Sequence, residues 1–255
     1  MFAPGPGFFS TAQTFPPFPF PPPFDLSTAI LNTGNPLTAD IVHCFALALA
    51  SSGGVIDFAT GLNATTSGTI TIDSTAAGNA YAALNPNGFT PALSVGNLTD
   101  KFTIIVIAKT FIFNFDGYFG HMFSQHPAWW MGNQDFLSDQ PTRLGMTIGG
   151  VEYSVNFADG GEWDDSSPLH VYGATYDGAN IKTYQDAVLI NTLPVTGNIS
   201  SQDAAHTRVG SYWGDTTGPL VGSRDEVVAL LFRRPWSAAE FAIYQANPWQ
   251  VWTTP

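Results

Sequence analysis

The sequence predicts an all-β protein: a sandwich of two antiparallel sheets, one short helix near the C-terminus and an extended N-terminal segment. Charged residues make up only 11% of the chain, while glycine, threonine, asparagine and aromatic residues are frequent, as in β-sandwiches. From residue 30 onward, short apolar or alternating runs are separated by turn residues. Sustained helical periodicity occurs in one place only, near residue 240. At 255 residues the chain suits one large β domain with an appendage.

Residues 1–26, MFAPGPGFFSTAQTFPPFPFPPPFDL, form that appendage, and residues 27–255 form the domain. Proline removes backbone donors and breaks helices, so the segment is expected to be an extended polyproline II arm. Its prolines also interrupt every apolar run that a secretory signal would need. Because exposed aromatic rings are unfavourable in water, the arm is expected to contact a partner surface. The phenylalanines assigned to this assembly contact are Phe2, Phe8, Phe9, Phe15, Phe18, Phe20 and Phe24.

The first half of the domain contains three recognisable strand regions. Residues 30–61 are typical of an approach loop, a strand, a glycine turn and a second short strand, and residues 63–75 favour a strand on an exposed surface. The run FTIIVIAKTFIF, residues 102–113, is almost continuously apolar, which predicts a strand buried on both faces at the centre of a sheet.

The second half continues with strands and ends in the helix. Strands are expected in residues 143–150, 151–157, 169–177, 179–195, 207–213 and 224–234. Asp177 to Ala179, the tripeptide DGA, marks a tight turn between two strands of a hairpin. Ser237 with Glu240 three residues later predicts a capping box, and the helix must end before Asn247-Pro248.

Three stretches resemble a known family. LHVYGATYDGANIKTYQDAVLI and GSRDEVVALLFRRPWSAAEFAIYQANPW resemble the hairpin and the closing segment of laminin-G-like, concanavalin A-like jelly-roll domains, and NPLTADIVHCFALALASSGGVIDFATG is similar to their opening strand. The resemblance covers residues 30–252 and implies a jelly-roll sandwich. Ala187 stands where the family usually has a turn glycine, and Leu169 where it often has tryptophan, so the turn type of the hairpin stays open. The ending ANPWQVW resembles versions found in tailed-phage structural proteins, which implies a decoration or tail-fibre role.

Charge and cysteine content exclude several classes of function. The net charge of −12 repels nucleic acid and anionic membrane surfaces, so neither is expected as a partner. No uninterrupted run of about 18 apolar residues is present, so no transmembrane segment is expected. Cys44, the single cysteine, lies in an apolar stretch and is expected to be a buried small hydrophobe.

No catalytic residue is assigned. Glycoside hydrolysis needs two carboxyl groups across the scissile bond, and the stretch EWDDSS offers Glu162 and Asp164 but has Ser167 near the place of the second glutamate. No serine-nucleophile motif occurs. The five histidines, His43, His121, His126, His170 and His206, lack a paired metal spacing and are interpreted as solvated or structural.

Two binding sites are considered. Aromatic platforms beside polar groups are typical of carbohydrate sites, and the candidates are Trp129, Trp130, Asn133, Asp135, Trp163 and Trp213. The competing interpretation, which the high apolar content favours, is that most of these tryptophans belong to the core or to a subunit contact. Trp236, Trp249 and Trp252 are assigned to packing. Calcium is a candidate ligand of the acidic cluster Asp159, Glu162, Asp164 and Asp165, although no metal ligand set is assigned and no other cofactor is expected.

The first functional hypothesis is a non-enzymatic virion structural protein, a capsid decoration or tail component. Its arm would hold it to other virion proteins, in a homo-oligomer, and its jelly-roll head would be displayed. The alternative is a glycan-binding adhesin module that contacts a host-surface glycan, and a glucanase-type hydrolase comes third. The arm favours the first hypothesis because a free lectin or hydrolase has no use for an apolar tether.

Overall fold

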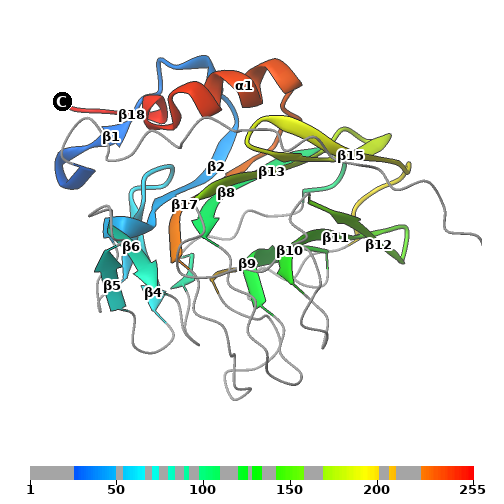
Figure 1. Cartoon of the computed structure of the whole chain (residues 1–255), viewed down its shortest axis with the longest axis horizontal. Coiled ribbons are helices and arrows are strands. Elements are labelled where there is room, and N and C mark those ends of the chain that lie inside the picture. The colour runs from blue at the N-terminus through cyan, green and yellow to red at the C-terminus, as the bar shows by residue number, and fades with distance from the viewer. Residues whose placement is uncertain are drawn as a thin grey trace, which may run out of the picture.

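In the part of the chain that the structure describes, two antiparallel β-sheets pack face to face, and one α-helix covers the outer face of one of them (Figure 1). The computed structural model describes residues 26–49, 54–66, 71–74, 80–83, 89–91, 98–109, 120–125, 128–133, 142–157, 169–200, 207–210 and 225–255. The N-terminal arm and its seven phenylalanines lie outside these residues. The predicted all-β sandwich is confirmed.

The first sheet is the one that the helix covers. Its strand order is β3 (Val55–Asp57), β2 (Ile41–Ala46), β17 (Asp225–Phe232), β8 (Phe102–Lys109), β13 (His170–Tyr176), β14 (Asn180–Gln185) and β15 (Val188–Pro194). Strand β6 (Ala80–Ala83) pairs with the start of β17 and with β5 (Thr71–Ser74).

The second sheet forms the other layer. Its order is β7 (Phe89–Thr90), β16 (Thr207–Val209), β9 (Gly120–Gln125), β10 (Trp129–Asn133), β11 (Arg143–Ile148) and β12 (Val151–Asn156). Strand β4 (Leu62–Thr66) pairs with β3 through one half and with β7 through the other. A continuous hydrogen-bonded path therefore runs from one layer into the other.

Strand β8 is the centre of the first sheet, as its apolar sequence predicts. It pairs with β17 on one side and β13 on the other, and residues 102–108 are fully buried. Phe102, Ile104 and Val106 point between the layers, whereas Ile105 and Ile107 point toward the helix. Burial on both faces explains why the run does not alternate with polar residues. Residues 110–113 of the predicted strand lie outside the described part.

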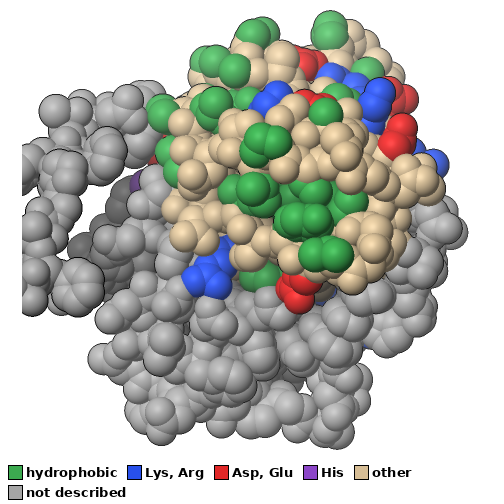
Figure 2. Space-filling view, turned by 90° about the vertical axis from the view of Figure 1, so that its right-hand side faces the viewer, with side chains coloured by type: hydrophobic (Ala, Val, Ile, Leu, Met, Phe, Trp, Pro, Cys, Tyr) green, Lys and Arg blue, Asp and Glu red, His purple; other side chains and the backbone are tan. Residues whose placement is uncertain are grey.

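At one side of the sandwich, the edge strand of each sheet, β12 and β15, has no strand beyond it in the described strand order. The carbonyl oxygen of Asn156 in β12 accepts hydrogen bonds from Thr183 Oγ1 at 2.8 Å and Asn191 Nδ2 at 2.9 Å, which ties the layers together there. Figure 2 shows this side, where apolar side chains gather among mostly uncharged ones. Val151 and Leu189 of the two edge strands are 54% and 48% exposed.

Helix α1 (Ala238–Ala246) begins and ends where the sequence predicts. Ser237 and Glu240 form the expected capping box, and Asn247 is the C-cap. Phe241 packs against Gly173 of β13, where a Cβ atom would lie 2.3 Å from the ring, and stacks on Tyr184 at a centroid distance of 4.2 Å. The glycine is therefore what lets the helix approach the sheet.

The C-terminal tryptophans are packing residues, as predicted. Trp236, Trp249 and Trp252 are buried among aromatic and aliphatic side chains between α1 and the first sheet. After α1, the 3-10 turn η5 (Pro248–Val251) leads into β18 (Trp252–Thr253), which pairs with β1 (Ile30–Leu31). Further 3-10 turns are η1 (Leu26–Thr28), η2 (Pro36–Thr38) and η3 (Leu47–Leu49).

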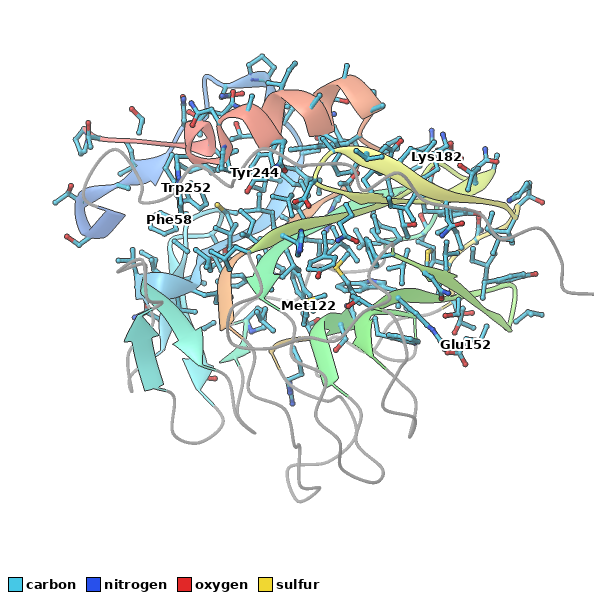
Figure 3. The ribbon with its side chains drawn as sticks, viewed as in Figure 1. Phe58, Met122, Glu152, Lys182, Tyr244 and Trp252 are labelled. Carbon is cyan, nitrogen blue, oxygen red and sulfur yellow. The ribbon has the colours of Figure 1, made fainter. Side chains whose placement is uncertain are left out.

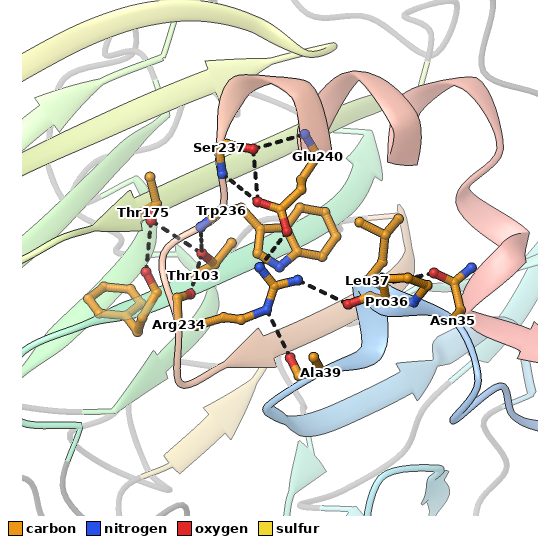
Figure 4. Close-up of polar contacts among 11 residues, drawn as sticks. Asn35, Pro36, Leu37, Ala39, Thr103, Thr175, Arg234, Trp236, Ser237 and Glu240 are labelled. Carbon is orange, nitrogen blue, oxygen red and sulfur yellow. Dashed lines mark hydrogen bonds and ion pairs between the residues drawn. The ribbon is translucent and has the colours of Figure 1, made fainter.

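A polar network holds the start of α1 to the N-terminal part of the domain (Figure 4). The Arg234 guanidinium pairs with Glu240 and donates to the carbonyl oxygens of Ala39 at 3.1 Å and Pro36 at 3.3 Å. Glu240 in turn accepts the Ser237 backbone N–H at 2.8 Å. One carboxylate thus serves both the helix cap and the arginine.

Thr103 anchors the same loop to the central strand. Its hydroxyl donates to the Arg234 carbonyl oxygen and accepts the Trp236 backbone N–H, both at 2.8 Å. The Thr175 hydroxyl lies 3.2 Å away and donates to the Phe102 carbonyl oxygen at 3.0 Å. Thr103 therefore satisfies two backbone groups of a loop that would otherwise be buried unpaired, and Thr175 satisfies a carbonyl group of β8.

Both turns of the β13–β14–β15 meander use an aspartate. Asp177 accepts the backbone N–H groups of Ala179 at 2.9 Å and Asn180 at 2.7 Å, which confirms the predicted DGA turn. In the next turn, Asp186 and Ala187 have φ of 49° and 65°. Two consecutive positive φ values are typical of a type I′ turn, so the missing glycine at 187 has not changed the turn type that hairpins favour.

Candidate functional site

Trp129 is a core residue. It lies in β10, not in a loop, and is 0% exposed, with its ring stacked 5.9 Å from Phe102 and edge-on to Phe123 at 5.3 Å. The expectation of an exposed stacking platform is wrong at this position. The physical reason is that the residue belongs to a strand whose one face is the interface between the layers.

Trp130 occupies the opposite face of β10. Its indole lies over Gly145 of β11, where a Cβ atom would be 2.0 Å from the ring, and its Nε1–H donates to Glu152 Oε1 at 3.2 Å. The side chain is only 5% exposed, so Trp130 also does not offer an open platform. Figure 3 shows Glu152 on the face that points away from α1, whereas Met122 points between the layers.

That outward face carries a row of polar and small residues. The register places Arg208, Ser124, Trp130, Gly145 and Ser154 side by side across five strands. Burial lowers the pKa of the Arg208 guanidinium, and its Nη1 donates to the Thr207 carbonyl oxygen at 2.9 Å. No sequence motif predicts this row, because neighbours across strands follow only from the register.

Strand ends of both sheets lie together at one end of the sandwich. In the second sheet, Asn133 pairs with Gly120, and Arg143 pairs with both Gly132 and Asn156, so these strand ends lie together. In the first sheet, Lys109 pairs with Asp225, and Ala108 pairs with His170. Segments 110–119, 134–141, 158–168 and 211–224 join these ends.

Most of the predicted site residues belong to those segments. Asp135, Trp163, Trp213 and the acidic cluster Asp159, Glu162, Asp164 and Asp165 lie outside the described residues, and of Asn133 only the backbone is described. Among the residues that the structure describes, no three His, Cys, Asp or Glu side chains are grouped to hold a metal.

Two histidines form closely matched pairs with aspartates. His43 Nδ1 lies 2.6 Å from Asp57 Oδ2, and the Cys44 backbone N–H donates to Asp57 Oδ1 at 2.9 Å. His170 Nδ1 lies 2.6 Å from Asp186 Oδ2, and the Val171 N–H donates to Asp186 Oδ1 at 2.9 Å.

In both cases one carboxylate binds two consecutive residues of a strand, through the imidazole of the histidine and the backbone N–H of the residue after it. The first pair is buried, and the second lies where His170 follows segment 158–168. No residue spacing in the sequence predicts either pair. His126 and His206 lie outside the described residues, as does the side chain of His121.

No protein-family model and no curated protein matches the sequence. Among solved structures, the binding domain of Paraclostridial Mosquitocidal Protein 1 aligns with a TM-score of 0.59 at 12% identity, over 82% of this chain and 52% of that one. The receptor-binding domain of botulinum neurotoxin type G aligns with a TM-score of 0.57 at 14% identity, over 82% and 52%.

A third structure is matched over almost its whole length. Domain 4 of AbnA, a GH43 extracellular arabinanase from Geobacillus stearothermophilus in complex with arabinotriose, aligns with a TM-score of 0.53 at 14% identity. The alignment covers 80% of this chain and 97% of that domain. The chain thus spans about half the length of the toxin binding domains and nearly all of the arabinanase domain. What they share is the fold.

Proposed function

We propose that the protein is a non-catalytic binding module that recognises carbohydrate at one end of the sandwich. This is the end where the strand ends that flank segments 110–119, 134–141, 158–168 and 211–224 lie together. The observation that carries the proposal is the register of the two sheets, which brings these strand ends together. Rigid β-scaffolds commonly present binding residues on loops at one end. By sequence, these segments contain Trp163, Trp213 and Asp135.

The chemistry of these residue types suits a sugar. An indole ring stacks on the C–H face of a pyranose or furanose, and nearby amide and carboxylate groups take its hydroxyls. The net charge of −12 favours a neutral glycan over a sulfated or otherwise anionic one. Calcium held by Asp159, Glu162, Asp164 and Asp165 would fit the same segments and stays a prediction.

The structural neighbours support the proposal by analogy. AbnA domain 4 is described in complex with arabinotriose, and the two toxin structures are binding domains. Because one fold hosts many functions, this analogy favours a binding role without choosing the ligand.

The test is a glycan-binding screen of the full chain followed by calorimetry. The variants Trp163→Ala and Trp213→Ala are expected to weaken binding of the best neutral oligosaccharide by about tenfold or more, since a lost stacking contact costs about 1.4 kcal/mol or more. Val151→Ala is the matched control, because Val151 is exposed at the opposite end of the second sheet.

Three outcomes would overturn the proposal. Binding to no member of a broad neutral-glycan panel is one, and unchanged affinity in both tryptophan variants is another. Hydrolysis of a glucan that disappears in Glu162→Gln would replace a binding role with a catalytic one.

The arm supports a second role, anchoring of the head to a particle. We infer that residues 1–24 attach it to other virion proteins or to copies of itself. Seven phenylalanines, each contributing about 1.5–3 kcal/mol when buried, offset the ordering of a segment that proline has already stiffened. The virion assignment depends on this segment and on the resemblance noted from the sequence.

Deleting residues 1–24 tests the anchoring role. The truncated protein is expected to stay folded and monodisperse while losing assembly in sedimentation or co-purification with particles. Retained assembly would contradict it. Unfolding of the truncated head would also contradict it, since the arm would then complete the core of the head.

A further inference from the structure

Five buried polar atoms inside the sandwich make no hydrogen bond with the protein. They are Gln125 Oε1 and Nε2, Thr207 Oγ1, Trp129 Nε1 and His43 Nε2. The four side chains that carry them are at most 1% exposed. Buried polar side-chain atoms nearly always have a partner, which is protein or ordered water, so several together call for an explanation.

Three of the four side chains are neighbours on the second sheet. Gln125 of β9 is directly opposite Thr207 of β16 on one side and Trp129 of β10 on the other. Trp129 points between the layers, and residues paired across strands share a face, so all three point inward.

His43 lies near this row from the facing layer. Its ring centroid is 6.4 Å from that of Phe123, which is 5.3 Å from that of Trp129. Phe123 precedes Gln125 by two residues in β9 and therefore shares its inward face. The five atoms thus belong to one region, between β2 on one side and β16, β9 and β10 on the other.

The hydrogen-bonding capacities of these groups complement water. The glutamine amide supplies donors and an acceptor, the threonine hydroxyl supplies both, and the indole N–H is a donor. His43 Nδ1 faces the Asp57 carboxylate, which accepts four donors in all, so in the neutral ring Nδ1 carries the proton and Nε2 is an acceptor. Opposite side chains on a sheet have Cβ atoms about 4.5–5.5 Å apart, within reach of a single bridging molecule.

We propose that this region is an internal hydration site, in which ordered water bridges Gln125, Thr207 and Trp129 of the second sheet to His43 of the first. Water suits the site because the five atoms include both hydrogen-bond donors and acceptors, and because the glutamine, threonine and tryptophan side chains that carry four of them are uncharged. The site is independent of the proposed carbohydrate-binding end, since Gln125 and Trp129 lie at the opposite ends of β9 and β10 from Gly120 and Asn133.

The sign of a stability change tests the proposal. If water satisfies these groups, Gln125→Met and Thr207→Val remove bridged partners, and each lowers the melting temperature. The double variant is expected to lose less than the sum of the single variants, because both share the same water. Ser154→Ala is the matched control, since Ser154 is an exposed residue of β12 whose hydroxyl can be removed without emptying a buried position. A rise in melting temperature for both single variants would overturn the proposal, because deleting dry, unsatisfied groups stabilises a core.

A spectroscopic measurement reads the water directly. In ¹⁵N-labelled protein, the Trp129 indole N–H, assigned by its loss in Trp129→Phe, is expected to show cross-peaks to water. The Trp130 indole, which donates to Glu152, is the comparison. Absence of water cross-peaks at Trp129, or a crystal structure with no water within about 3.2 Å of these five atoms, would overturn the proposal.

Discussion

At the scale of single residues, aspartate carboxylates accept hydrogen bonds that hold turns and strand ends in place. The Asp57 carboxylate accepts hydrogen bonds from the His43 imidazole, the backbone N–H groups of Cys44 and Ala59, and the Thr60 hydroxyl. Asp177 accepts two backbone N–H groups and the Lys182 ammonium at 3.1 Å. A carboxylate so placed replaces hydrogen bonds that a turn cannot make with its own backbone.

The Asp177 carboxylate is expected to make stability depend on acid. Burial raises its pKa, but the hydrogen bonds from the Ala179 backbone, Lys182 and the Asn180 backbone outweigh burial, so the pKa is lowered overall. A lowered folded-state pKa contributes stability above the ordinary value of about 3.9, and that stability is lost as the pH falls through the folded-state pKa. In urea titrations between pH 7 and pH 2.5, Asp177→Asn is expected to show a smaller acid-induced loss than the wild type. An unchanged pH profile would contradict this.

Cys44 is expected to be chemically inert in the folded protein. Burial, followed by the nearby Asp57 charge, raises the pKa of its thiol well above the usual value. The thiolate is the reactive form, so Ellman's reagent at pH 8 is expected to label Cys44 only after denaturant is added. Stoichiometric labelling of the native protein at a rate typical of a free thiol would refute this prediction.

At the scale of elements, close approach and turn geometry decide how the pieces meet. Helix α1 lies on the first sheet because Gly173 leaves room for Phe241. Strands β14 and β15 meet in a turn whose two central residues both have positive φ, although neither is glycine.

Gly173→Ala is expected to destabilise the protein. The new Cβ atom would lie 2.3 Å from the Phe241 ring, and overpacking a core typically costs about 1–3 kcal/mol in unfolding free energy. Gly34→Ala is the matched control, because there the nearest atom would be 3.6 Å away. Chemical denaturation of both variants checks the difference. Equal stabilities would show that α1 shifts without loss.

Ala187→Gly is expected to stabilise the β14–β15 hairpin. Alanine at φ of 65° carries the cost of the left-handed region, about 1–2 kcal/mol, which glycine avoids. Part of this gain is offset by the greater flexibility of glycine in the unfolded chain, so a net increase of about 0.5–1 kcal/mol is expected. Thermal and urea denaturation measure it, and a decrease would mean that Ala187 makes packing contacts that matter more than its backbone strain.

At the scale of the whole molecule, the two layers are expected to unfold together. The hydrogen-bonded path through β4 joins them, and one apolar cluster fills the space between them. Near-ultraviolet and far-ultraviolet circular dichroism are therefore expected to give one coincident urea transition. Two separate transitions would show that the layers are independent units.

The amino-acid pattern by itself determined the fold class, the central strand and the ends of the helix. Periodicity, capping and turn chemistry act over a few neighbouring residues, so they can be recognised in the sequence. They correctly predicted the strand at residues 102–109, the capping box of Ser237 and Glu240, and the turn at Asp177.

Tertiary structure decided everything that depends on register across strands. Trp129 and Trp130 are adjacent in the sequence, yet pleating sends one ring into the core and lays the other over Gly145. The His43–Asp57 and His170–Asp186 pairs and the inward row of Thr207, Gln125 and Trp129 likewise join residues from different strands. Such neighbours depend on which strands pair and in what alignment. The free energy that selects the alignment comes from burying the whole apolar face of each sheet. Because each short motif contributes only a small part of that free energy, no motif in the sequence predicts the alignment.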